Sequence, residues 1–80
     1  MNKEMKTEKP DMRRYRVQVG IQFRMQREAQ GWSVEQVATM ADVKAATVEK
    51  IEAGAFNVPL DVLARVAEAI GCVLNIQSKG

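Results

Sequence analysis

Residues 32–54, WSVEQVATMADVKAATVEKIEAG, decide the fold of this chain. Ser33 is a favourable N-cap, and Gln36 three residues later completes a capping box, which marks the start of a helix. Apolar residues then recur at helical spacing, namely at Val37, Ala38 and Ala41. The pattern predicts a short amphipathic helix that begins just after Ser33.

The second half of the same stretch predicts another short helix. Asp42 and Val43 interrupt the first apolar pattern. The pattern resumes with Val48 and Ile51 on one face and ends at Gly54. Because neither helix is long enough to bury much apolar surface alone, both need a helical scaffold. A helix presented at such a corner can enter the major groove of DNA.

A longer helix is predicted before this pair, from about Met12 to Gln30, with Asp11 as its cap and Gly31 as its end. Its apolar residues fall on two stripes. The first stripe has the apolar residues Val19 and Phe23 and continues at Gln26 and Arg27, which are polar, and the second contains Val17, Ile21 and Met25. One stripe must face the core, which leaves the other for a further element or another subunit.

A fourth helix is predicted to begin near Pro59 and to end at Gly71. Its apolar stripe consists of Leu60, Leu63, Val66, Ala67 and Ile70. Residues 72–77, CVLNIQ, then predict a short β-strand. An unpartnered strand leaves its backbone unpaired, so we expect it to pair with a second copy of the chain. The expected homodimer contacts are Val73, Leu74, Asn75 and Ile76, with Val17, Ile21 and Met25 as further candidates.

The composition limits the classes of protein to which this chain can belong. Eighty residues, of which 46% are hydrophobic and 28% charged, correspond to one small globular domain. No apolar run approaches the roughly 20 residues that span a bilayer, and the polar N-terminus lacks the apolar core of a signal peptide. We therefore expect a cytoplasmic protein without membrane contact. One cysteine and no histidine exclude an intrachain disulfide and the usual zinc sites, and we expect no cofactor.

The net charge of +2 conceals an asymmetry along the chain. Residues 1–27 contain eight basic and three acidic residues, whereas residues 28–80 contain four basic and seven acidic ones. Residues 1–11 have almost no apolar content and are predicted to form a disordered basic arm. Contact with a polyanion is therefore expected in the arm and the first helix. The alternative is a flexible tail that only aids solubility.

From about Val19 to Gly71 the chain resembles the Cro and phage-repressor type of helix-turn-helix domain, the lambda-repressor-like or xenobiotic-response-element family. The matching residues are Arg27, Gly31, Ser33, Val37, Ala38, Val43, Thr47, Val48, Ile51, Glu52, Gly54, Leu63, Ala67, Ile70 and Gly71. The resemblance implies an all-α domain of four to five helices over residues 12–71, here followed by a strand and tail over residues 72–80. It also implies close helix packing at Ala38 and an ion pair between Arg27 and Glu52.

The chain departs from this family at positions that bear on DNA binding. Val34 stands where the family commonly has a glutamine that contacts a phosphate, and Asp42 stands where it often has glycine. The predicted outward positions of the helix at about 44–53 are Lys44, Ala45, Ala46, Glu49, Lys50 and Ala53. Alanine can contact a thymine methyl group, and glutamate can accept only from cytosine N4. These residues favour modest specificity.

We expect a sequence-specific DNA-binding transcriptional regulator that acts as a homodimer on double-stranded DNA, with the helix at about 44–53 in the major groove. The candidate DNA-binding residues are Arg13, Arg14, Arg16, Ser33, Lys44, Ala45, Ala46, Thr47, Glu49, Lys50 and Asn57. The alternative is a protein-interaction module of the same fold, antitoxin-like or a co-regulator, with an unidentified protein partner and weak or no DNA binding. The absence of histidine, of a Gly-rich phosphate loop and of paired carboxylates argues against an enzyme.

Overall fold

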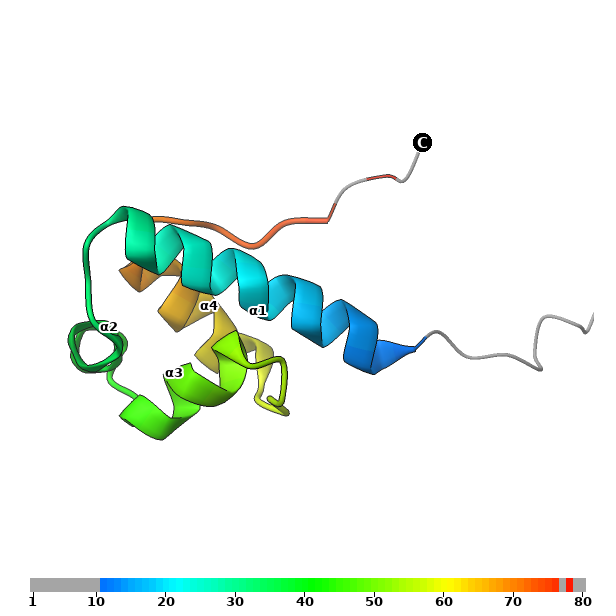
Figure 1. The fold of residues 1–80 in the computed structure, drawn as a ribbon, viewed down its shortest axis with the longest axis horizontal. Coiled ribbons are helices and arrows are strands. Elements are labelled where there is room, and N and C mark those ends of the chain that lie inside the picture. Colours follow the sequence, from blue (N-terminus) through cyan, green and yellow to red (C-terminus); the bar gives the residue numbers. More distant parts are fainter. Residues whose placement is uncertain (1–10, 77, 79–80) are drawn as a thin grey trace, which may run out of the picture.

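The computed structural model describes residues 11–76 and 78, which form four helices. These helices are α1 (Met12–Ala29), α2 (Val34–Ala41), α3 (Ala45–Glu52) and α4 (Leu60–Ala69). Figure 1 shows α1 running along the domain with the shorter helices gathered on one side of it. The all-α class is confirmed, with four helices in this part of the chain. The predicted basic arm, except for Asp11, lies outside the described residues.

The helices pack in an interleaved order. The main contacts join α1 to α3, α2 to α3, and α2 to α4. Two of these three pairs, α1 with α3 and α2 with α4, therefore join helices that are not consecutive in the sequence. The arrangement places α3 between α1 and α2, with its remaining face open to solvent.

Local sequence signals explain where the helices begin and end. The Asp11 carboxylate accepts a hydrogen bond from the backbone N–H of Arg13 at 3.1 Å, which caps α1. Ser33 Oγ accepts from the N–H of Gln36 at 3.1 Å, and Gln36 Oε1 accepts from the N–H of Ser33 at 2.8 Å. The predicted capping box is thus confirmed. After α2, Asp42 adopts the left-handed conformation, with φ 58° and ψ 49°.

The core lies where α2, α3 and α4 meet the inner face of α1. Its buried side chains are Phe23, Val37, Ala38, Ala41, Val48, Ile51, Val66, Ala67 and Ile70. Of the two stripes predicted on α1, the one with Phe23 faces this core. Leu60 was predicted on the inner stripe of α4, and this is wrong, because its side chain is 69% exposed. Leu60 is the first residue of α4 and lies at the edge of the domain, beyond the reach of the core.

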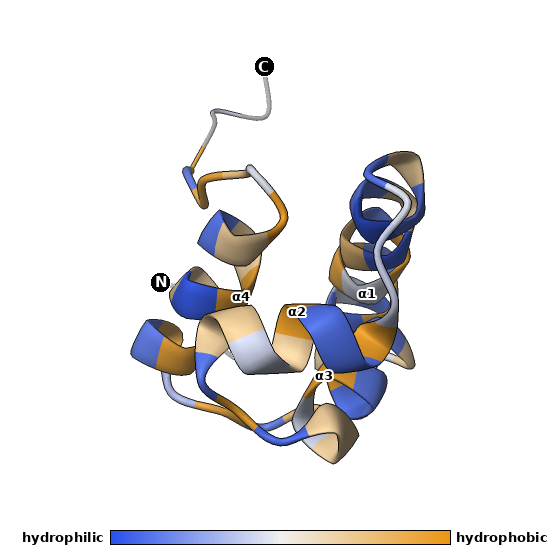
Figure 2. Ribbon diagram, turned by 90° about the vertical axis from the view of Figure 1, so that its left-hand side faces the viewer, coloured by the Kyte–Doolittle hydropathy of each residue, from blue (hydrophilic) through white to orange (hydrophobic). Residues whose placement is uncertain are grey.

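The predicted C-terminal strand is absent from the described residues. Residues 72–76 form neither helix nor strand, because no other strand in the described chain pairs with them. The N–H of Cys72 donates to the carbonyl of Ala67 at 2.9 Å, which ties the start of this segment to α4. The segment then faces α1 across a groove of about 450 Å³, lined by apolar residues that include Val19, Phe23 and Leu74. Figure 2 shows the segment after α4 coloured mostly as hydrophobic.

None of the helices in the described part of the chain is long and apolar enough to cross a membrane.

Candidate nucleic-acid interface

One face of α3 is buried and the opposite face is open. Val48 and Ile51 are 1% and 0% exposed and anchor the helix in the core. With about 100° between successive residues, the opposite face carries the residues that are exposed in the structure. These are Ala46, Glu49, Lys50 and, just after the helix, Ala53. The open face of α3 therefore has two small residues and one charge of each sign.

One of the residues expected on this face lies elsewhere, and one DNA-binding candidate lies at its margin. Ala45 was expected to point outward, and this is wrong, because it is half-buried and packs against the core. Ala45 is the first residue of α3 and follows directly on the turn from α2. Thr47 is also half-buried, which leaves it at the margin of the open face.

The turn between α2 and α3 orients the start of α3. The N–H of Val43 donates to the carbonyl of Ala38 at 3.0 Å, and the half-buried Val43 side chain packs against the core. Lys44 is the N-cap of α3, and its carbonyl accepts from the N–H of Thr47 at 2.9 Å. The Lys44 side chain makes no capping bond and is exposed. Its ammonium group is therefore free to meet a phosphate at the start of α3.

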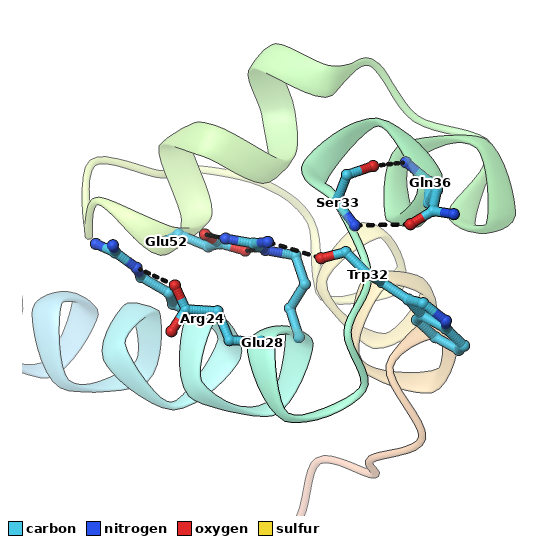
Figure 3. A network of polar contacts seen from close by, with 7 residues as sticks. Arg24, Glu28, Trp32, Ser33, Gln36 and Glu52 are labelled. Carbon is cyan, nitrogen blue, oxygen red and sulfur yellow. Dashed lines mark hydrogen bonds and ion pairs between the residues drawn. The ribbon is translucent and has the colours of Figure 1, made fainter.

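An ion pair fixes the end of α3 against α1. Arg27 Nε donates to Glu52 Oε2 at 2.6 Å, and Arg27 Nη2 donates to Glu52 Oε1 at 3.0 Å. The side chains of Arg27 and Glu52 are only 14% and 10% exposed. Arg27 Nη1 also donates to the carbonyl of Trp32 at 2.8 Å. Figure 3 draws the hydrogen bonds that end at the Trp32 carbonyl and at Glu52 as dashed lines. One guanidinium group thus connects α1, the turn before α2, and the end of α3.

The hydrogen bonds to Glu52 raise the pKa of the Arg27 guanidinium above its ordinary value, and the charges of Glu52, Glu28 and Glu35 act in the same direction. Burial opposes this shift. Since a raised pKa favours the charged form, the stability that the pair contributes persists up to strongly alkaline pH.

The start of α2 explains the departure at Val34. Val34 is half-buried and packs against the core, so its side chain replaces a polar, outward group with an apolar, inward one. Ser33 is exposed, and its Oγ already accepts the capping bond from Gln36. A hydroxyl group has one donor besides its acceptor sites, so Ser33 can still donate to a phosphate. Ser33 thus remains a phosphate candidate, whereas Val34 offers no polar side chain.

The arginines of α1 do not share one face. Gly20 and Val17 lie against the end of α3 and the glycine after it. Helical geometry places Arg13 within about 20° of Gly20 around α1, and Arg14 about 120° away. Arg13 and Arg14 are exposed, and Arg16 is half-buried. The structure thus brings Arg13 to the side of α1 that faces α3 and turns Arg14 away from it.

Asn57 is exposed in the loop between α3 and α4. Arg24 lies one turn before Arg27 and was not among the sequence candidates. Its Nε donates to Glu28 Oε2 at 3.1 Å, and this pair is exposed. The Trp32 carbonyl was also missed, because a backbone acceptor leaves no signal in a sequence. The glycine at position 20 did leave a signal, since an isolated glycine inside a helix often marks a close packing contact.

Comparisons with known proteins agree with this geometry. A model of the helix-turn-helix domain matches residues 18–74. A similar solved structure is the high-resolution crystal structure of the restriction-modification controller protein C.AhdI from Aeromonas hydrophila. The two chains are 28% identical, the match covers 79% of this chain and 91% of that chain, and the TM-score is 0.73. No curated protein sequence matches significantly. The domain model covers most of the chain, which therefore belongs to the helix-turn-helix domain family of DNA-binding regulators.

Proposed function

We propose that this protein is a sequence-specific transcriptional regulator that binds double-stranded DNA as a homodimer and places α3 in the major groove. The observation that carries the proposal is the open face of α3, held opposite its buried anchors Val48 and Ile51. The likeness to a restriction-modification controller supports a regulatory role. Small alanines on this face allow the helix to approach the groove floor closely and to contact thymine methyl groups.

The charge distribution supports the proposed phosphate contacts. Between residues 28 and 76 there are three basic residues, Lys44, Lys50 and Arg65, against seven acidic ones. Attraction to DNA therefore has to come largely from the part of the chain before residue 28, which carries a net charge of +5. In this proposal Lys44, Lys50 and the α1 arginines hold the backbone, and α3 reads the bases.

The homodimer would form through residues 73–76. Val73 and Ile76 are 76% and 100% exposed, and no backbone hydrogen bond joins residues 73–76 to another described residue. On α1, Val17, Ile21 and Met25 are 43%, 50% and 62% exposed. Pairing two copies of this segment as antiparallel strands would satisfy its backbone groups and bring two domains into two-fold symmetry. A two-fold dimer fits a palindromic site on DNA.

The test of function is selection of bound duplexes from a random pool, carried out at a low and a high salt concentration. The proposal expects a palindrome to be enriched at both salt concentrations, with half-sites a helical turn or a multiple of it apart. Recovery that disappears at the higher salt, without any shared sequence, would show non-specific phosphate binding only. That result would reject sequence-specific regulation.

The test of the dimer is analytical ultracentrifugation of the full chain and of two variants. Truncation after Gly71 and the single change Ile76→Asp should both yield monomers. Ile76 is fully exposed, so its substitution cannot damage the fold of one protomer. Both variants should also bind the selected duplex more weakly. A full-length protein that sediments as a monomer at micromolar concentration would exclude this dimer.

One observation favours the alternative, a protein-interaction module. Glu49 is exposed in the middle of the open face of α3, where it would repel phosphates unless a cytosine amino group lay in front of it. If no duplex is enriched at either salt concentration, this face is better explained as a surface for a basic protein partner.

A further inference from the structure

Gly20 occupies a place where glycine is unfavourable. It lies in the interior of α1, where glycine weakens a helix relative to alanine because it orders a more flexible backbone. Gly20 is buried. A glycine at such a place needs a packing reason.

The reason is the last turn of α3. A Cβ atom on Gly20 would lie 2.4 Å from the carbonyl oxygen of Ile51 and 2.7 Å from that of Glu52. Both oxygens belong to the backbone of α3, and real Cβ atoms essentially never come closer than 3.0 Å. A second contact of this kind lies nearby, since a Cβ on Gly54 would lie 2.7 Å from Cα of Val17. The two segments thus touch backbone to backbone at two places.

We propose that Gly20 is a positioning residue for α3. Its missing Cβ sets how closely the last turn of α3 lies against α1, and thereby the angle at which α3 presents its open face. The inference rests on the proposed function, in which that face reads DNA. Gly20 itself is buried against α3, so in this proposal it acts through the position of α3 and not through a contact with DNA.

The displacement that a Cβ atom on Gly20 would require is larger than a helix that contacts DNA bases can accommodate. Alanine at position 20 would force the contact to the Ile51 oxygen to open from 2.4 Å to at least 3.0 Å. Binding residues generally have to be held within about 0.5 Å of their productive positions. Because α2 and the buried Val48 hold α3 on its other side, the displacement at Ile51 would tilt the helix. The tilt would move Glu49 and Lys50 relative to the bases.

The test compares Gly20→Ala with the matched change Gly31→Ala. Gly31 follows α1 with φ +76°, and nothing lies within 4 Å of a Cβ built on it. Alanine there strains the backbone without touching α3. Residual dipolar couplings of the free proteins measure the angle between α2 and α3. Fluorescence anisotropy measures affinity for the selected duplex and for a random duplex.

Gly20→Ala should change the angle between α2 and α3 and weaken binding to the selected duplex by about tenfold, the loss of one ordinary base contact. Its affinity for the random duplex should fall much less, because Lys44 and the α1 arginines lie outside the displaced last turn of α3 and keep their phosphate contacts. Gly31→Ala should lower the melting temperature and leave the angle and the affinity ratio as in the wild type.

If the angle between α2 and α3 in Gly20→Ala is unchanged, the proposal is wrong. A melting temperature above that of the wild type, together with an unchanged angle, would show that the higher helix propensity of alanine outweighs the close contact with α3. If Gly20→Ala does not fold in buffer, the couplings are measured in trimethylamine N-oxide, which favours compact states. A wild-type protein that binds no duplex would refute the proposed function, while the couplings would still decide the role of Gly20.

Discussion

Removal of either partner of the Arg27–Glu52 pair should destabilise the domain strongly and unequally. Arg27→Ala removes three hydrogen bonds, two to Glu52 and one to the Trp32 carbonyl. It also leaves the Glu52 carboxylate, which is 10% exposed, without its counter-charge. Glu52→Ala removes two hydrogen bonds, and the remaining guanidinium keeps its bond to Trp32. Arg27→Ala should therefore be the more damaging change.

The magnitudes follow from the geometry. Breaking a buried pair by removing one partner destabilises by roughly 3–5 kcal/mol, and the small exposure of both side chains places this pair at the low end. We expect a loss of about 3 kcal/mol for Arg27→Ala and about 2 kcal/mol for Glu52→Ala. The double variant should lose about 3 kcal/mol, since the second removal no longer strands a charge. The coupling energy between the two residues is then about 2 kcal/mol.

Urea unfolding followed by circular dichroism measures the four free energies of unfolding in this cycle. Arg24→Ala is the matched control, because Arg24 lies one turn earlier and pairs with Glu28 in an exposed bridge. An exposed pair at this spacing contributes about 0.3–0.5 kcal/mol at most. Losses below about 0.5 kcal/mol for each single variant, adding strictly in the double variant, would refute the reasoning and place both residues among ordinary surface charges.

Three further predictions concern charge and backbone conformation. Deletion of residues 1–10 removes Lys3, Lys6 and Lys9, and should flatten the slope of log K against log salt by up to about 0.9 per lost phosphate contact; an unchanged slope would make the arm only a tail. Asp42→Gly should raise the free energy of unfolding by about 0.5 kcal/mol in a thermal melt, because relief of the left-handed conformation exceeds the added chain entropy; a lower melting temperature would contradict this. Lys50→Ala should weaken binding to all duplexes about equally, whereas Glu49→Gln should raise non-specific affinity and change the preferred base at one position; if Glu49→Gln alters neither, α3 is not the reading element.

The sequence predicted those features that depend on local chemistry. The capping box at Ser33 and Gln36 follows from two side chains three residues apart, and the structure forms both of its bonds. Both apolar stripes of the first helix could be recognised from the sequence, but the choice between them was left open, and the structure turns the one with Phe23 to the core. The contact of Arg27 with Glu52 spans 25 residues, so it came from the family resemblance and not from any local pattern.

Features that depend on the position of an element within the domain were not predictable in this way. The stripe on α4 is apolar from Leu60 to Ile70, yet only its later residues reach the core, because Leu60 lies at the edge. Helical spacing likewise placed Ala45 outward, whereas the turn from α2 directs it inward. The alternating residues 72–77 satisfy the pattern of a strand, but a strand also needs a neighbour, which the pattern cannot supply.

The interleaved packing of the helices bears on how the chain folds as it is synthesised. Because α1 packs on α3 while α2 packs on both α3 and α4, no fragment made of the first two or the last two helices contains a complete set of contacts. A nascent chain can therefore form its first two main interfaces, of α1 and α2 with α3, only after α3 has left the ribosome, and the third only after α4 has followed. From the same interlocking we expect unfolding to be a single cooperative event. A protease cut in the loop between α3 and α4 should consequently expose the whole domain to degradation and release no stable half.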